Sequence, residues 1–394
     1  MSTSIGGVGC SLMDYLFTGV EFGGEGFARY RSRTRGDGGL EPGTLVFLDA
    51  LERFAGGPYR QVLTAVTGDA QPTSRNLGGP SVVALVHAAQ LLHDSEVPVS
   101  FYGVRGDDAV GADIAAVLAA TPLLWNHYTI AAGTSPFTHA LSDPDWADGA
   151  GERCFVNSTG VAAQFDAARI DPSLYDNDIV AFGGTALVPQ LHAQLHLPLQ
   201  RAKEAGALTV VNTVFDFVNE SRAPHAPWPI GDSAVSYANT DLLVVDAEEA
   251  YRLSGESVPQ RAADWFVRAG VSAVVITSGA EPLLATAKGG RFKALPAQHF
   301  PVSARIAAEL RAPDRPAGDT TGCGDNFVGG LLYSLAVQLD AGERILDLRD
   351  ALIWAVASGG YACFSLGGTM IERHPGEKHT AIAAYVRDYE QQLV

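Results

Sequence analysis

The sequence predicts an α/β protein built on a doubly wound, mainly parallel sheet flanked by helices. Short apolar runs at 178–182, 207–212, 242–245 and 273–277 read as strands, and helical patterns at 188–205 and 248–253 stand between them. Each strand is apolar throughout, as expected when helices cover both faces of a parallel sheet. This alternation, sustained along most of the chain, predicts the fold class.

The earlier elements follow the same rhythm. A first strand at 4–12 ends near Asp14, and an apolar helix at 82–92 follows the Gly78-Gly79-Pro80 turn. A strand at 97–104 leads through a Gly-rich turn at 103–111 into another helix.

Two segments interrupt the rhythm, at about 15–45 and 128–161. Gly, aromatic and turn-forming residues are frequent in both, so we expect β-hairpin material that projects from the sheet and forms a small lid. The arginines at 29, 31, 33 and 35 favour a solvated face over substrate contact. No linker separates independent domains, so one domain is expected over 1–394.

Composition limits the partners. The 394 residues are 47% hydrophobic, which is typical of a globular protein. The 27 basic and 44 acidic residues give a net charge of −17, which opposes binding to nucleic acid or an anionic membrane. Four scattered cysteines lack C-x-x-C spacing, and neither a leader nor a membrane-spanning apolar run is evident, so a reducing cytoplasm is expected.

The most informative stretch runs from Gly318 to Phe327 and reads GDTTGCGDNF. Its glycines allow successive N–H groups to converge on an anion, and the helix that follows adds its positive end. Asp325 would repel a phosphate there unless it acts on a neighbouring group, so a base that accepts a hydroxyl proton is indicated. As an isolated residue, Asp325 would more often be a helix cap.

The full string resembles the Asp-Thr-x-Gly-Ala-Gly-Asp signature of the ribokinase-like (PfkB) carbohydrate kinases, with Cys323 where alanine is usual. The resemblance covers nearly the whole chain and implies a ribokinase-like fold with a small β lid. It also implies transfer of the γ-phosphate of ATP, with Mg²⁺, to a hydroxyl of a small polyol. Asp325 is then the base, and the N–H groups of Gly322, Cys323 and Gly324 hold the transferring group.

At the acceptor end, the resemblance gives substrate-binding roles to Asp14, Gly78 and Gly79. The family's asparagine four residues after the second glycine is replaced by Val83. Asn76 is a weak substitute. One polar contact to the acceptor is therefore missing or comes from elsewhere.

At the nucleotide end, the resemblance implies that Glu249, with Asp246, acts on Mg²⁺ through water. Glu248 is expected only to complement a helix N-terminus. The remaining roles implied by the resemblance are nucleotide binding by Thr277, Gly279, Ala357 and Ser358, and a monovalent cation site, such as one for K⁺, at Asp319 and Thr321. A homodimer formed through the lid is expected by analogy.

The acceptor remains open between a sugar or sugar acid, which is slightly favoured, and a ribonucleoside. Aromatic side chains at Tyr15, Phe17, Phe22 and Phe27 would either stack a base or pack within the lid. A different class is a catalytically silent sugar- or nucleotide-binding protein, favoured by the lost asparagine and opposed by the intact Asp325. A phosphatase is disfavoured because no second acidic metal cluster accompanies the turn.

Overall fold

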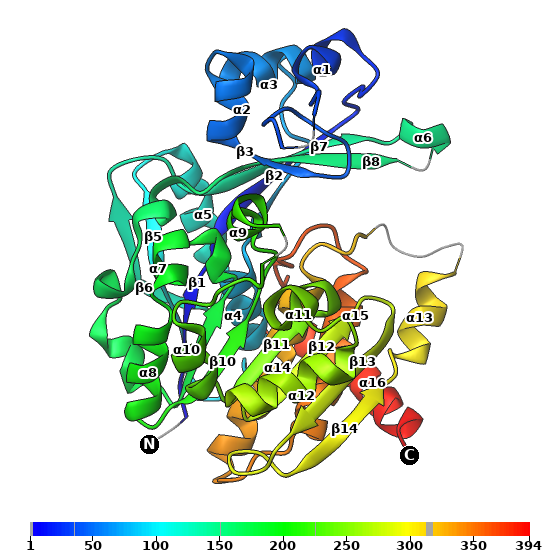
Figure 1. Ribbon diagram of the computed structural model, residues 1–394. Helices are drawn as coiled ribbons and strands as arrows, with labels where there is room; N and C mark the ends of the chain where they lie inside the picture. Colours follow the sequence, from blue (N-terminus) through cyan, green and yellow to red (C-terminus); the bar gives the residue numbers. More distant parts are fainter. Residues whose placement is uncertain (1–2, 35, 150, 225, 313–317) are drawn as a thin grey trace.

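Two sheets organise the molecule (Figure 1). The computed structural model describes residues 3–34, 36–149, 151–224, 226–312 and 318–394. Within these residues, a nine-stranded sheet has the order β14-β13-β12-β11-β10-β9-β1-β5-β6, and a five-stranded sheet has the order β3-β8-β7-β2-β4.

The strands are short and mostly buried. They are β1 Ile5–Gly9, β2 Leu12–Thr18, β3 Leu45–Phe47, β4 Ser74–Gly78, β5 Val99–Gly106, β6 Leu124–Ala131, β7 Phe137–Asp143, β8 Glu152–Ser158, β9 Ile179–Gly183, β10 Leu208–Asn212, β11 Leu242–Asp246, β12 Ala273–Ser278, β13 Glu281–Ala287 and β14 Leu295–Phe300.

Helices connect the strands and cover the sheets. They are α1 Glu25–Tyr30, α2 Leu48–Ala55, α3 Tyr59–Thr67, α4 Pro80–Leu91, α5 Ala109–Leu118, α6 Trp146–Gly149, α7 Pro189–Ala193, α8 His196–Glu204, α9 Phe217–Arg222, α10 Ser233–Ala238, α11 Ala247–Ser254, α12 Pro259–Ala269, α13 Ala304–Leu310, α14 Cys323–Asp340, α15 Leu348–Ala362 and α16 Glu377–Gln392. Short 3-10 helices lie at Gly160–Gln164, Ala167–Arg169, Pro172–Asp176 and Thr185–Leu187.

The large sheet confirms the predicted fold class. Strands β6, β5, β1, β9, β10, β11 and β12 pair in parallel, and β13 and β14 add an antiparallel edge. Apolar side chains of α4, α14 and α15 form a core on one face, and those of α8, α11 and α12 form a core on the other. Burial on both faces explains why the central strands read as unbroken apolar runs.

Two features of the large sheet and its helices were not predicted. The edge strands β6, β13 and β14 were missed because, unlike the central strands β1, β9 and β10, each mixes exposed and buried residues. The helix expected at 188–205 is two helices, since the chain breaks at Gln194 and Leu195. The helix after the Gly-rich turn is α14, as predicted.

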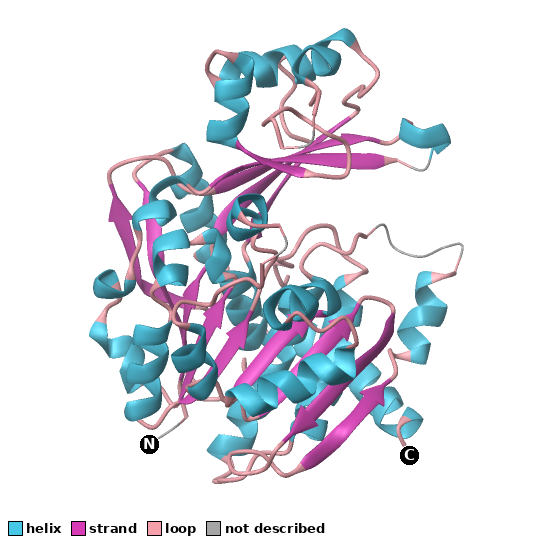
Figure 2. Cartoon of the chain, viewed as in Figure 1, coloured by secondary structure: helices cyan, strands magenta, loops and turns pink. Residues whose placement is uncertain are grey.

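The smaller sheet, which we call the lid, stands over the carboxyl ends of the central strands (Figures 1 and 2). Strands β7 and β8 form the antiparallel hairpin expected within 128–161. The segment 17–43 is not a hairpin: it contains α1, which packs with α3 on the outer face of the lid. The hairpin expected over about 15–45 is wrong there because Phe22 and Phe27, taken as part of a projecting hairpin, belong to the lid core.

The aromatic residues proposed for base stacking all serve this packing. Phe22 and Phe27 are at most 1% exposed, and their ring centroids lie 4.4 Å apart. Tyr15 and Phe17 are also buried and contact the ring of His139. These side chains therefore stabilise the lid and are not available to stack a nucleobase.

The arginine cluster lies on the solvent side of the lid helices. Arg29, Arg31 and Arg33 are exposed and stand over the rings of Tyr30, Trp146 and Phe54, in that order. The expectation of a solvated face is confirmed for these three arginines, and residue 35 lies outside the described residues.

Replacing Phe27 by alanine should reduce the free energy of unfolding by about 3–5 kcal/mol, because a buried aromatic side chain is lost from the lid core. Urea titration followed by tryptophan fluorescence measures this change. As a control, Leu197→Ala removes a side chain that is 51% exposed and should change stability by about 0.5 kcal/mol or less. A loss below about 1 kcal/mol in Phe27→Ala would contradict this packing.

Candidate active site

The Gly-rich turn is held by a neighbouring loop. Gly322 caps α14 with φ +74°, and a Cβ at this position would lie 2.4 Å from the Cα of Gly368. The side chain of Asn326 donates to the carbonyls of Gly322 and Gly368, both at 2.8 Å. Only glycine permits this approach, so the shape of the turn depends on the 365–369 loop.

The turn is open on the side where α14 begins. A Cβ on Gly324 would meet nothing within 4 Å, and the first N–H groups of a helix lack partners within it. The N–H of Cys323 donates to the Thr320 carbonyl at 3.3 Å, which is a long bond. This end of α14 therefore offers backbone donors and a positive dipole to an anion.

Asp325 lies in the first turn of α14 and faces Asp14 of the lid. Burial raises the pKa of Asp325 to about 7. Burial also raises the pKa of Asp14 to about 7; a hydrogen bond with Thr138 opposes this shift, and the negative charges of Asp325 and Asp319 add to it. The two sequence-predicted residues are thus neighbours, although they are far apart in the chain.

The strand that carries Asp14 differs from the prediction. The chain breaks after Gly9, and Asp14 lies inside the separate lid strand β2 rather than at the end of the first strand of the large sheet. Residues 4–12 are small or apolar and include no charged residue, which concealed this break. As a consequence, the lid itself brings Asp14 to the turn.

Gly78 lies directly against this carboxylate, and Gly79 lies against the backbone of Cys10 and Ser11. A Cβ on Gly78 would lie 2.0 Å from Oδ2 of Asp14. Gly79 has φ +102°, and a Cβ there would lie 2.7 Å from the carbonyl oxygen of Cys10. Both positions therefore require glycine for close packing, and the substrate contact expected of the pair stays a prediction.

A row of polar residues crosses the lid on the face toward the turn. Asn76 pairs with Asp14, Asp14 with Thr138, and Thr138 with Asn157, so the four side chains share one face. We call these residues the polar row. The neighbouring His139 faces the opposite way and accepts or donates a 2.8 Å bond with Tyr59 of α3.

Asn157 is the residue of this row that sequence reasoning missed. Its side-chain Nδ2 donates to Oγ1 of Thr138 at 2.9 Å, while its Oδ1 is buried without a hydrogen-bond partner. The side chain is 2% exposed. A buried amide oxygen without a partner costs free energy, which indicates a role in binding a donor. Its place in the polar row follows only from the register of β7 and β8, which pairs it with Thr138.

Asn76 is not free to replace the missing asparagine. Its Nδ2 donates to the Thr369 carbonyl at 2.9 Å, and its Oδ1 accepts from the Thr369 N–H at 2.8 Å. Val83 is buried and packs against Gly368. Both residues therefore support the loop that shapes the turn.

An ion pair connects the lid with the turn. Arg153 on β8 donates to Oδ2 of Asp319 at 3.1 Å. Oδ1 of Asp319 accepts from the N–H groups of Thr321 at 3.0 Å and Gly367 at 3.2 Å. Asp319, expected at a cation site, thus joins the lid, the turn and the 365–369 loop, and Arg153 brings a positive charge to the turn.

On the other side of the turn, Asp246 and Glu249 form a capping box at the start of α11. Asp246 accepts from the Glu249 N–H at 2.7 Å, and Glu249 accepts from the Asp246 N–H at 3.0 Å and from Oγ1 of Thr213 at 2.6 Å. Burial and the charge of Asp246 raise the pKa of Glu249 to about 7, with a smaller contribution from Asp325. Glu248 pairs with Arg252 at 2.8 Å, which confirms its helix-end role.

The nucleotide-side residues divide into two groups. Thr277 pairs with Asp246 in the parallel sheet, and Gly279 with φ +58° forms the turn between β12 and β13. Ala357 and Ser358 are both 0% exposed, and Oγ of Ser358 faces Gly330 across the interface of α14 and α15. The expected adenine contact is therefore wrong for these two side chains, since they pack between helices.

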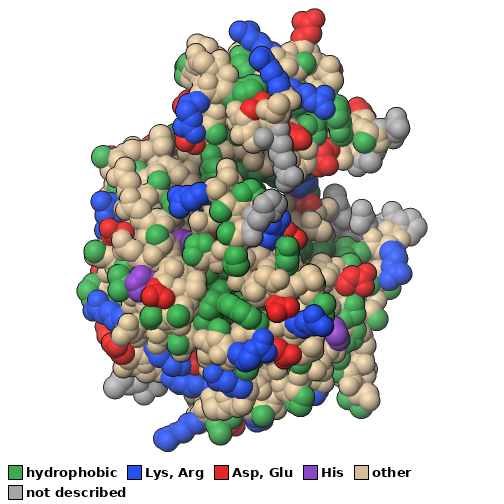
Figure 3. Space-filling model, in the orientation of Figure 1, with side chains coloured by type: hydrophobic (Ala, Val, Ile, Leu, Met, Phe, Trp, Pro, Cys, Tyr) green, Lys and Arg blue, Asp and Glu red, His purple; other side chains and the backbone are tan. Residues whose placement is uncertain are grey.

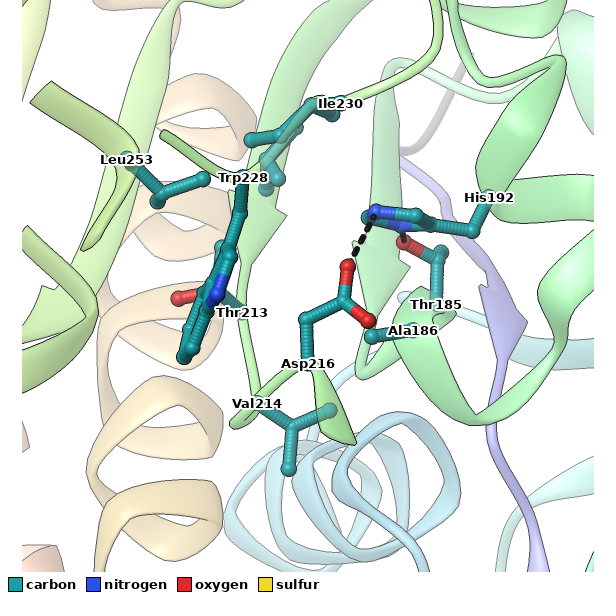
Figure 4. A pocket seen from close by; sticks show the side chains of 10 residues that line it. Thr185, Ala186, His192, Thr213, Val214, Asp216, Trp228, Ile230 and Leu253 are labelled. Carbon is teal, nitrogen blue, oxygen red and sulfur yellow. Dashed lines mark hydrogen bonds and ion pairs between the residues drawn. The ribbon is translucent and has the colours of Figure 1, made fainter. Parts of the chain in front are cut away.

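A small cavity beside this site holds a buried histidine (Figure 4). His192 bonds Oγ1 of Thr185 at 2.9 Å through Nδ1 and lies 3.4 Å from Oδ2 of Asp216 through Nε2. The cavity measures about 10 Å³, room for about one water molecule, so it holds no substrate. Asp216 also caps α9, and the cluster therefore positions α9, whose Phe217 contacts Phe47 of the lid.

None of the described helices is sufficiently long and apolar to span a bilayer. Among all the described residues, no group of three His, Cys, Asp or Glu side chains is arranged to bind a metal ion.

Known proteins resemble this chain in sequence and in fold. The model of the pfkB family carbohydrate kinases matches residues 52–372. The chain belongs to this family. Over 186 residues it is 28% identical to the aminoimidazole riboside kinase of Salmonella typhimurium, and the match covers 47% of this chain and 52% of that protein. The chain thus spans about half the length of this relative.

Two solved structures share the fold. An adenosine kinase from Schistosoma mansoni, in complex with 2-fluoroadenosine, is 16% identical with a TM-score of 0.68, covering 94% of this chain and 97% of that one. A putative ribokinase II from E. coli, in complex with ATP and Mg²⁺, is 16% identical with a TM-score of 0.61 and full coverage of both chains. This pfkB protein therefore has the ribokinase-like fold that the sequence predicted.

The raised pKa values predict a pH-dependent stability. Between about pH 4 and 7 the folded protein holds protons on Asp14, Asp325 and Glu249 that the unfolded chain has lost. The free energy of unfolding should therefore fall as the pH rises through this range and level off above it.

Asp325→Asn removes one of these carboxylates and should be more stable than the wild type at pH 8, with a smaller difference at pH 5. Urea titrations at the two pH values measure this, with Asp264→Asn on the exposed face of α12 as the control. If the variant and the wild type differed in free energy of unfolding by the same amount at both pH values, burial would not raise the pKa of Asp325.

Proposed function

We propose that this pfkB protein transfers the γ-phosphate of ATP to a hydroxyl of a small sugar or riboside. The observation that carries the proposal is the meeting of Asp14 and Asp325 at the open N-terminus of α14. In this proposal the Asp14 carboxylate holds hydroxyls of the acceptor, and the Asp325 carboxylate lies beside an anion-binding turn. Figure 3 shows the molecule hollowed between the lid and the larger body, where both substrates would enter.

Asp325 is the proposed base. Burial raises its pKa to about 7, which places it where a base is both deprotonated and able to take a proton near neutral pH. It accepts the proton of the acceptor hydroxyl as the oxygen attacks phosphorus. The positive dipole of α14 and the N–H groups of Gly322, Cys323 and Gly324 stabilise the negative charge of the transferring group.

The acidic pair of Asp246 and Glu249 suits a hydrated magnesium ion that arrives with ATP. Their oxygens match the hard ligands that Mg²⁺ prefers, and Glu249 lies within electrostatic reach of Asp325. When bound, the ion neutralises phosphate charge. Thr277 and Gly279, next to Asp246, are proposed to contact the nucleotide phosphates. A monovalent cation at Asp319 and Thr321 stays a prediction, as does a dimer through the lid.

The acceptor site is proposed to use the polar row in place of the family's asparagine. Asp14 accepts from two adjacent hydroxyls, and the free Oδ1 of Asn157 accepts from a third. The match to a riboside kinase supports an acceptor that carries ribose. The lid aromatics give no support to base stacking, so the sugar moiety rather than the base is expected to dominate recognition. A silent binding protein is disfavoured, because it would not need a base at the open turn.

The direct test is a coupled assay of ADP formation with Mg–ATP and a panel of free pentoses, hexoses, sugar acids and ribosides. A thermal-shift screen of the same compounds finds ligands that stabilise the folded state. We expect at least one sugar or riboside to support turnover well above ATP hydrolysis alone. Binding of a panel member without any ADP formation would instead favour the silent binding protein.

Asp325→Asn should lower kcat by about 10²-fold or more while leaving ATP binding unchanged, because the base is lost and the turn remains. Turnover with the best acceptor from the panel and calorimetric titration with Mg–ATP measure the two effects. The exposed Asp264→Asn variant serves as control. Wild-type turnover in Asp325→Asn would overturn the assignment of the base.

Asn157→Leu should raise the KM for the acceptor by about 3- to 10-fold and leave the KM for ATP unchanged, since one hydrogen bond to the acceptor is lost. Steady-state kinetics with each substrate varied in turn separates the two constants. Ser158→Ala, on the opposite face of β8, should alter neither. An unchanged acceptor KM in Asn157→Leu would show that the polar row does not reach the substrate.

A further inference from the structure

Two cysteines lie in contact at the start of the active-site helix. The Sγ atoms of Cys323 and Cys363 are 3.1 Å apart, although the residues are 40 positions apart in the chain. Cys323 is the first residue of α14, and Cys363 caps the end of α15. We propose that this pair is an oxidisable dithiol, and that its intramolecular disulfide prevents the Gly-rich turn from supporting phosphoryl transfer.

The surrounding backbone leaves the two thiols facing each other. A Cβ on Gly318 would lie 2.1 Å from the carbonyl oxygen of Cys363, and one on Gly359 would lie 3.0 Å from that of Cys323. Glycine at both positions lets the start of the turn and the start of α14 pack directly on α15. The dithiol therefore sits where both ends of the Gly-rich turn meet the same helix.

Exposure separates this pair from the other cysteines. Cys323 and Cys363 are partly exposed, while Cys10 and Cys154 are buried at 3% and 0% exposure. The contact with Cys323 lowers the pKa of Cys363, which favours its thiolate. Cys363 is thus the more reactive thiol toward a dissolved oxidant.

A low-molecular-weight disulfide such as glutathione disulfide supplies the oxidising equivalents. The Cys363 thiolate attacks one sulfur of this disulfide, forms a mixed disulfide and releases one glutathione thiolate. Cys323 then loses its proton and attacks Sγ of Cys363, releasing the second glutathione. One protein dithiol and one glutathione disulfide become one protein disulfide and two glutathione thiols.

The disulfide would tie the first residue of α14 covalently to the C-cap of α15. Cys323 contributes its own N–H to the proposed phosphate site, so the cross-link fixes the position of one of the groups that must align with the transferring phosphate. Small misplacements of such groups reduce turnover strongly. This effect on catalysis rests on the proposed function, whereas formation of the disulfide does not.

The test incubates the folded, reduced protein with glutathione disulfide and follows mass and turnover together. We expect a loss of two hydrogen atoms, a Cys323–Cys363 cross-linked peptide, and about a tenfold or larger fall in ADP formation that dithiothreitol reverses. Mass needs no acceptor, so failure of the kinase proposal leaves this readout intact.

Cys363→Ser should keep its turnover under the same treatment and yield no cross-link, and Cys363→Ala provides a second variant if serine impairs folding. Cys154→Ala should still form the cross-link, since Cys154 packs inside the lid. A wild-type protein that forms no cross-link at equilibrium would overturn the dithiol. A cross-linked protein with full turnover would overturn the switch.

Discussion

The site depends on holding carboxylates together in partly buried space. The negative charges of Asp325 and Asp319 act on Asp14 in a chain that already carries a net charge of −17, and burial makes the ionisation of Asp14 and Asp325 costly. The structure offsets this repulsion with the positive end of α14 and with Arg153 on Asp319. The proposed acceptor and phosphate sites would therefore share one electrostatic arrangement, to which the lid contributes Asp14 and Arg153.

Glycine is the second requirement, because at two positions in the site a Cβ atom would collide with a neighbouring segment. Gly78 makes room for the Asp14 carboxylate, and Gly322 makes room for Gly368. Each contact joins segments that are distant in the chain. The 365–369 loop is consequently as important to the turn as the turn's own residues, although it carries no group proposed to react.

The sequence predicted the central strands of the large sheet and the Gly-rich turn that leads into α14 well, because both depend on local signals. Continuous apolar strands and the turn from Gly318 to Asp325 are readable from neighbouring residues. The acceptor end was less predictable. The sequence did not separate strand β2 from β1, and only the register of β2, β7 and β8 places Asn157 on the same face as Asp14. Ser358 was misassigned because a motif position does not reveal which side of a helix is buried.

The three partners of Asp319 have a thermodynamic consequence. Its carboxylate is shared by a lid arginine, the N–H of Thr321 and the N–H of Gly367. Under the proposed function, an acceptor that stabilises the lid would also stabilise the turn proposed to receive ATP. Linkage would then require the acceptor and ATP to raise each other's affinity by the same factor, a positive cooperativity inside a single chain.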